Sequence, residues 1–102
     1  MESTKLGFAT TCNKGFSITF DNGVTVSVQF GPGNYCSNHN LNYNPFIELR
    51  NCQSPNAEIA IWDKTGEFIT KEFENNLNDD VIGYLKPDRV LDALNWAKNY
   101  KS

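Results

Sequence analysis

Three cysteines and a single histidine are the most reactive side chains of this sequence. Cys36 and His39 have the C-x-x-H spacing of two zinc ligands, or of a nucleophile beside a base. Cys12 and Cys52 could complete a tetrahedral zinc site if the fold brought them together, but a closed zinc site usually takes its ligands from two tight pairs and the sequence has only one. No local motif supplies a group that would orient a Cys36/His39 dyad. We therefore expect reduced thiols and neither a metal site nor a catalytic cysteine.

Carboxylates offer little more chemistry. Asp79 and Asp80 are adjacent and could shift each other's pKa, but such a pair in a polar stretch is usually solvated. The sequence has no glycine-rich dinucleotide fingerprint, no phosphate-binding loop and no His-Glu-x-x-His metalloprotease motif. These observations predict that the protein is not an enzyme and needs no cofactor.

A binding site is better motivated in the segment 31–56, which is rich in Asn and Pro and is predicted to be mostly loop. Its start, Gly31-Pro32-Gly33-Asn34-Tyr35, combines backbone N–H groups, an amide and an aromatic ring. Such a loop could stack a base on Tyr35 and hold a phosphate through its N–H groups. The commoner alternative is a turn with Tyr35 packed into the core. Three polar side chains follow in the sequence: Asn38, His39 and Arg50.

Two residues outside this loop are further candidates. Trp62 alternates with Ile59 and Ile61, so it lies on the opposite face of a strand, either packed under a loop, which we favour, or exposed to a partner. Arg89 is either a solvated residue on a helix edge or a ligand for an anion across an oligomer interface. The predicted ligand-binding residues are Asn34, Tyr35, Asn38, His39, Arg50, Trp62 and Arg89.

The elements that must position these residues are mostly strands. Alternating apolar and polar residues, many of them β-branched or aromatic, are typical of strands that bury one face. This pattern predicts strands over 6–12, 16–20, 24–30 and 57–62, a short strand at 46–49, a hairpin partner at 67–70, and a strand or irregular segment at 81–85. The polar stretch 72–80 is predicted to be a loop, with Phe73 and Leu77 as anchors.

The register of the first long hairpin follows from its turn, Asp21-Asn22-Gly23. A two-residue loop would place Phe20 opposite Thr25 and mix the apolar and polar faces. A three-residue loop places Phe20 opposite Val24, so that apolar residues meet apolar residues. We therefore predict the three-residue turn, with Gly23 in the left-handed conformation.

One helix is predicted over residues 87–100, where the period changes to 3.6. Pro87 suits its first turn and Asp88 the positive end of its dipole. The predicted buried stripe consists of Val90, Leu91, Ala93, Leu94, Ala97 and Tyr100, with Trp96 at its border. Such a stripe must pack on a sheet. The sequence thus predicts an α+β fold in one domain, residues 1–102: an antiparallel β-sheet of about 4–6 strands built from hairpins and covered by one C-terminal α-helix.

Charge and hydropathy narrow the possible partners. Nine Lys and Arg residues against twelve Asp and Glu residues give a net charge of −3, which disfavours bulk DNA and anionic membranes. No apolar run approaches the roughly 20 residues of a membrane span, and the N-terminus lacks the apolar core of a signal peptide. We expect a protein that is made and used inside a cell.

Longer phrases of the sequence resemble a group of small single-domain proteins encoded by tailed bacteriophages. The most specific of them is Val28-Gln29-Phe30-Gly31-Pro32-Gly33-Asn34-Tyr35-Cys36. The other phrases are Phe20–Gly23, Ala57–Asp63 and Tyr84–Val90. The resemblance implies an accessory phage protein in the cytoplasm of the infected bacterium, and it supplies no catalytic residues.

Small non-catalytic phage proteins often antagonise bacterial defence. One such class, the viral sponges, consists of small oligomers that sequester cyclic nucleotide immune signals. By this analogy the leading hypothesis is a homo-oligomeric counter-defence protein that sequesters a small phosphorylated ligand, such as a cyclic nucleotide, without catalysis. The alternatives are an inhibitor that binds a bacterial defence enzyme through its acidic surface, and a minor virion or assembly component.

Overall fold

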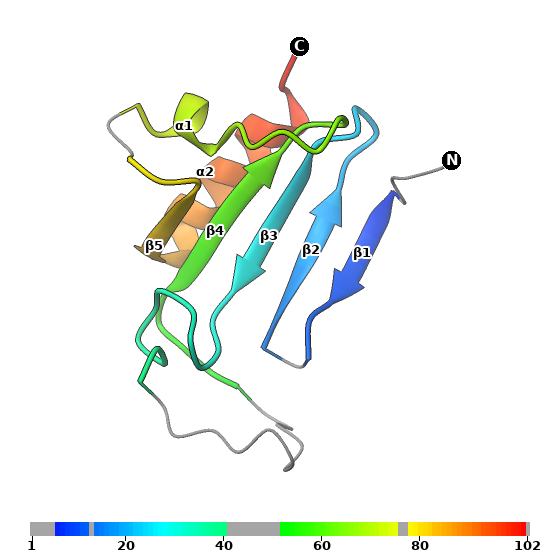
Figure 1. The fold of residues 1–102 in the computed structure, drawn as a ribbon. Helices are drawn as coiled ribbons and strands as arrows, with labels where there is room; N and C mark the ends of the chain where they lie inside the picture. Colours follow the sequence, from blue (N-terminus) through cyan, green and yellow to red (C-terminus); the bar gives the residue numbers. More distant parts are fainter. Residues whose placement is uncertain (1–5, 13, 41–51, 76–77, 102) are drawn as a thin grey trace.

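A computed structural model describes residues 6–12, 14–40, 52–75 and 78–101 (Figure 1). Its five strands form one antiparallel sheet in the order β1-β2-β3-β4-β5. The predicted α+β architecture is therefore confirmed, whereas the strand predicted at 46–49 lies outside the described residues. The elements are β1 (Gly7–Thr10), β2 (Gly15–Thr19), β3 (Thr25–Gln29), β4 (Ala57–Trp62), α1 (Thr70–Phe73), β5 (Val81–Leu85) and α2 (Pro87–Lys98).

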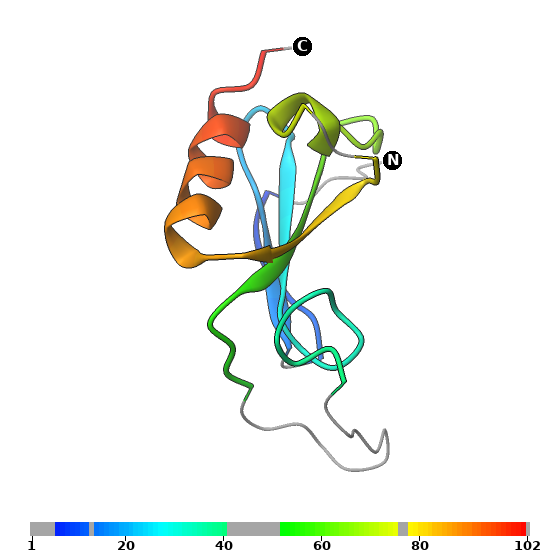
Figure 2. The ribbon, with the colours of Figure 1, turned by 90° about the vertical axis from the view of Figure 1, so that its left-hand side faces the viewer.

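Helix α2 covers one face of the sheet, as Figure 2 shows edge-on. It contacts β3 and β4 and brings the small side chains of Ala93 and Ala97, both 0% exposed, against the sheet. The strand residues beneath it alternate with polar ones, as the sequence predicts, so that only one face is apolar. The strand part of this core consists of Val26, Val28, Ala57, Ile59 and Ile61.

The predicted register of the β2–β3 hairpin is confirmed. The backbone N–H of Phe20 donates to the carbonyl of Val24 at 2.9 Å, and Ile18 pairs with Val26. Gly23 has φ +84°, the left-handed conformation that the three-residue turn requires. Matching of apolar faces was therefore sufficient to choose between the two possible turns.

The hairpin partner predicted at 67–70 is present only as a short antiparallel return, in which the Asp63 N–H donates to the Glu67 carbonyl and the Ile69 N–H to the Ile61 carbonyl. Only one bridge forms there, between Trp62 and Phe68, and helix α1 then begins at Thr70. The reason is that the Thr70 hydroxyl accepts a hydrogen bond from the Ile61 N–H at 2.9 Å and so replaces a backbone partner. Because the Thr70 side chain satisfies the outward N–H of Ile61 on β4, a further strand residue is not needed at this position.

Leu91 departs from the predicted buried stripe of α2. Its neighbours on the stripe pack against the core, but Leu91 is 56% exposed. The helix contacts β3 and β4, and Leu91 borders an open hollow that Phe16 of β2 also lines. The periodicity located the helix correctly and overestimated the width of its buried face.

The C-terminal end of α2 is tied to the β2–β3 turn by Asn22. Its side-chain Nδ2 donates to the carbonyls of Ala97 at 2.9 Å, Lys98 at 3.3 Å and Tyr100 at 3.1 Å. Its Oδ1 accepts from the Val24 N–H at 3.0 Å within the turn. The last carbonyls of a helix have no partner inside it, so this amide joins turn and helix end into one unit.

Candidate functional site

The predicted ligand loop carries its aromatic rings at the surface. The rings of Tyr35 and His39 stack with centroids 5.4 Å apart and planes within 11° of parallel. Tyr35 is 48% exposed, so its ring does not anchor the loop in the core. The loop is held instead by its backbone, because the carbonyl of Tyr35 accepts from the Tyr84 N–H at 2.8 Å.

Both predicted amides of this loop serve the loop itself. Asn34 Nδ2 donates to one oxygen of Glu58 at 3.1 Å, and the Tyr35 N–H donates to the other at 3.3 Å. Asn38 Nδ2 donates to the carbonyl of Phe30 at 2.8 Å. These bonds shape the loop, and the Glu58 carboxylate at its side disfavours a phosphate there.

Trp62 lies at the far end of β4 from this loop (Figure 1). Its ring meets that of Phe68 edge-on, with centroids 5.9 Å apart. The side chain is partly buried, which agrees with the favoured interpretation of a packed residue. Trp62 and the Tyr35–His39 stack therefore do not form one site.

Arg89 projects from α2 toward α1. It forms ion pairs with Glu74 at 3.1 Å and Asp92 at 3.3 Å, and its guanidinium lies 4.4 Å from the centre of the Phe73 ring. The hydrogen bond that Arg89 donates to Glu74 raises the pKa of Arg89 above its usual value. This cation already has partners within the chain. Arg50, the remaining predicted residue, lies outside the described residues.

The thiol and imidazole groups also bond to different partners. Cys36 is buried with its Sγ 3.7 Å from the carbonyl of Gly31, whereas His39 Nδ1 lies 2.9 Å from that of Asn34. All three cysteines are free thiols. Within the described segments, no group of three or more His, Cys, Asp or Glu side chains is placed to hold a metal ion.

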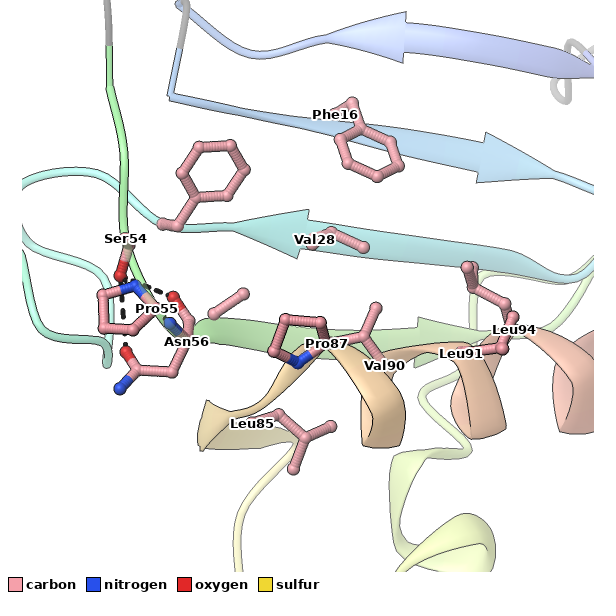
Figure 3. A pocket seen from close by; sticks show the side chains of 12 residues that line it. Phe16, Val28, Ser54, Pro55, Asn56, Leu85, Pro87, Val90, Leu91 and Leu94 are labelled. Carbon is pink, nitrogen blue, oxygen red and sulfur yellow. Dashed lines mark hydrogen bonds between the residues drawn. The ribbon is translucent and has the colours of Figure 1, made fainter.

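A hollow between α2 and the sheet was not predicted from the sequence (Figure 3). It has a volume of about 270 Å³ and is almost entirely apolar. Phe16 and Val28 line it from the strands, and Val90, Leu91 and Leu94 line it from the helix. The exposed Leu91 thus faces an open apolar space rather than bulk solvent alone.

A second hollow of about 660 Å³ lies beside β1 and β2 near the other end of α2. Leu6, Phe8 and Ile18 line it, together with Lys98 of the helix. Phe16 and Ile18 are two residues apart on β2 and share a face, so the two hollows lie on the same side of the sheet. We call their combined lining the apolar channel, defined by Leu6, Phe8, Phe16, Ile18, Leu91 and Leu94.

No protein-family model matches the chain, and no curated protein or solved structure is significantly similar to it. Of the helices in the described ranges, none is long and apolar enough to cross a membrane. A function must therefore be inferred from the geometry of the molecule. Its two candidate binding features are the apolar channel and the Tyr35–His39 stack.

Proposed function

We propose that this protein is a non-catalytic binding protein whose apolar channel takes a segment of a protein partner. One observation carries the proposal: Phe8 and Leu6, 84% and 58% exposed, line one hollow, and Leu91, 56% exposed, lines the other hollow on the same side of the sheet. Scattered apolar residues are common on protein surfaces, but exposed apolar residues gathered on one side of a sheet favour an interaction site. A partner that covers it removes this area from water, at roughly 25 cal/mol per Å².

The shape of the channel favours a polypeptide segment over a small molecule. Helix α2 has 12 residues and forms one wall, which makes that wall about 18 Å long. Two hollows along such a wall suit apolar side chains spaced along a helix or strand. A compact ligand would fill one hollow and leave the other in water.

The resemblance to phage proteins supplies a setting for this partner. In that setting the partner is a bacterial defence enzyme in the cytoplasm of the infected cell, and the protein acts as its inhibitor. A virion or assembly component would use the same channel differently, and mass spectrometry of purified virions distinguishes this alternative.

The channel is tested by the change Leu91→Asp, which places a charge in its wall. We expect at least a tenfold loss of the partner retained from bacterial lysate, because burial of an unpaired carboxylate is costly. Tyr84→Asn is the matched control, since Tyr84 is 55% exposed, lines neither hollow, and has a φ of +58° that Asn tolerates. Equal retention by Leu91→Asp, or loss with Tyr84→Asn, would contradict the channel as the binding site.

The Tyr35–His39 stack supports a second function, sequestration of a nucleotide-type immune signal. A planar pair of rings with Tyr35 half exposed can be extended by a nucleobase, whatever the identity of the base. The ligand would be bound and released unchanged. This candidate stands second because the amides of the loop are used internally and Glu58 lies beside them.

A panel of cyclic nucleotides, followed by melting temperature, tests the stack. A ligand at a hundredfold excess over Kd stabilises the fold by about 2.7 kcal/mol, which is a visible shift. Tyr35→Ala should weaken binding roughly tenfold or more, while its retained Cβ keeps the packing on Gly83. Tyr35→Phe keeps the ring and should bind normally. If no nucleotide raises the melting temperature, sequestration is excluded for that panel and the channel remains the proposal.

A further inference from the structure

The two edges of the sheet differ in how they are covered. At β5, the Tyr84 N–H donates to the Tyr35 carbonyl at 2.8 Å. Gly83 leaves room for this loop, because a Cβ there would lie 2.8 Å from the Tyr35 Cβ. The outer edge of β5 is therefore partly covered by the chain itself. Among the strands of the described residues, β1 has β2 as its one neighbour.

The outward-facing backbone groups of β1 can be identified. The Thr11 N–H donates to the Gly15 carbonyl at 2.9 Å, so the groups of Thr11 point toward β2. Backbone groups alternate in direction along a strand, so those of Ala9 also face β2, whereas those of Phe8 and Thr10 face outward. Among the residues that the structure describes, none donates to or accepts from these outward groups.

This edge lacks the features that keep edge strands single. Residues 6–12, Leu-Gly-Phe-Ala-Thr-Thr-Cys, contain no charged residue and no proline. Soluble proteins commonly place lysine, proline or a bulge on such strands to prevent pairing with another chain. Phe8 adds a ring that is 84% exposed on the strand itself.

We infer that β1 pairs antiparallel with β1 of a second copy of this chain, so that the two sheets become continuous across a two-fold axis. An antiparallel edge is complementary to itself under two-fold symmetry, which a foreign strand need not be. Each copy carries a net charge of −3 and repels the other, but the uncharged segment 6–12 keeps like charges out of the contact.

The register that pairs both outward residues of β1 with each other is centred on Ala9. Phe8 lies opposite Thr10 of the partner subunit, and Thr10 opposite the partner's Phe8, so that both outward residues form their backbone hydrogen bonds. Ala9 then meets the partner's Ala9 at the axis, in the close non-hydrogen-bonded position that a small side chain suits. The pairing uses the backbone edge of β1, whereas the proposed function uses side chains of the channel, and Phe8 belongs to both. Thr10→Pro and Leu91→Asp therefore test the two separately.

Sedimentation of the purified full-length chain tests the dimer. We expect a dimer, and we expect Thr10→Pro to weaken it at least tenfold, because proline removes an outward N–H and no bond to β2. Thr10→Ser keeps the N–H and serves as the control. A wild-type monomer, or a dimer that persists unchanged in folded Thr10→Pro, would overturn the inference.

Disulfide trapping tests the register even if Thr10→Pro fails to fold. In a Cys12→Ser background, Ala9→Cys should form an intermolecular disulfide under mild oxidation, because antiparallel non-hydrogen-bonded pairs lie about 4.5 Å apart at Cα. Thr65→Cys, in an exposed turn away from β1, should remain monomeric on a non-reducing gel. Equal cross-linking of both variants, or of neither, would contradict the proposed pairing.

Discussion

Replacement of Thr70 by valine is expected to lower the free energy of unfolding by about 2–3 kcal/mol, although the two side chains have nearly the same shape. Thr70 is 0% exposed, and its hydroxyl accepts from the Ile61 N–H at 2.9 Å and donates to the Ile61 carbonyl at 3.2 Å. That carbonyl also accepts from the Ile69 N–H at 2.9 Å, whereas the Thr70 hydroxyl is the acceptor that the described residues provide for the Ile61 N–H. Valine would leave this donor buried without a partner.

Urea denaturation of Thr70→Val and Thr70→Ser measures this effect. Serine keeps the hydroxyl and loses one methyl group, so we expect it to cost only about 1 kcal/mol. The Ile61 amide should also exchange with solvent faster in Thr70→Val than in the wild type. If valine is tolerated as well as serine, the hydroxyl contributes nothing and the packing of its methyl group accounts for the site.

Replacement of Asn22 by alanine is the second large expected effect, a loss of about 2–3 kcal/mol. Alanine removes the donor shared among the carbonyls at the end of α2 and the acceptor of the Val24 N–H. Helix end and hairpin turn would lose their connection together. The loss should appear in the midpoint of urea unfolding and in faster amide exchange through the last turn of α2.

Asn22→Asp keeps the shape of the side chain and replaces its N–H donor with a carboxylate oxygen, so it tests the contribution of the donor alone. At neutral pH a carboxylate would face helix carbonyls at the negative end of the helix dipole, so we expect it to destabilise at least as much as alanine. This repulsion raises the pKa of the new carboxyl in the folded state, so the lost stability returns as the pH falls through that raised pKa and is fully recovered below about 4, the pKa of the unfolded chain. Asp21→Asn, next to it and exposed, should show no such recovery. An Asn22→Asp variant as stable as the wild type would contradict the connection.

The parts of the fold that were predicted correctly depend on neighbours in sequence. Alternation located β2, β3 and β4, and matching of apolar faces fixed the turn at Gly23, because both signals are contained in a few adjacent residues. The strand at β1 was predicted from a weaker alternation and is present. The helix was located by its period and by Pro87 at its start.

The parts that were missed depend on contacts across the chain. In the sequence Asn22 is typical of a turn residue, and no neighbouring residue indicates that its side chain binds helix carbonyls 75 or more positions away. Thr70 fits a strand pattern as well as it fits the start of α1. Leu91 belongs to the helical stripe, and its exposure follows only from the placement of α2 on β3 and β4.

In the candidate site, too, local features were predicted from the sequence and long-range contacts were not. Composition correctly indicated a polar loop with rings at 31–40, but not that Asn34 and Asn38 would bond within it. Trp62 packs edge-on against the Phe68 ring, and Arg89 forms an ion pair with Glu74; neither contact is indicated by the local sequence. The apolar channel arises from the position of a helix relative to a sheet, which no local pattern contains.

The simple strand order of the sheet has a consequence for how the chain reaches this fold. Every strand pairs with its neighbours in sequence, so β1, β2 and β3 can assemble through short-range contacts before the rest. Addition of β4 then requires closure of the segment 30–56, whose entropic cost rises by only about 0.6 kcal/mol for each doubling of its length. A change in the length of the connection between β3 and β4 should therefore alter the order and speed of folding little.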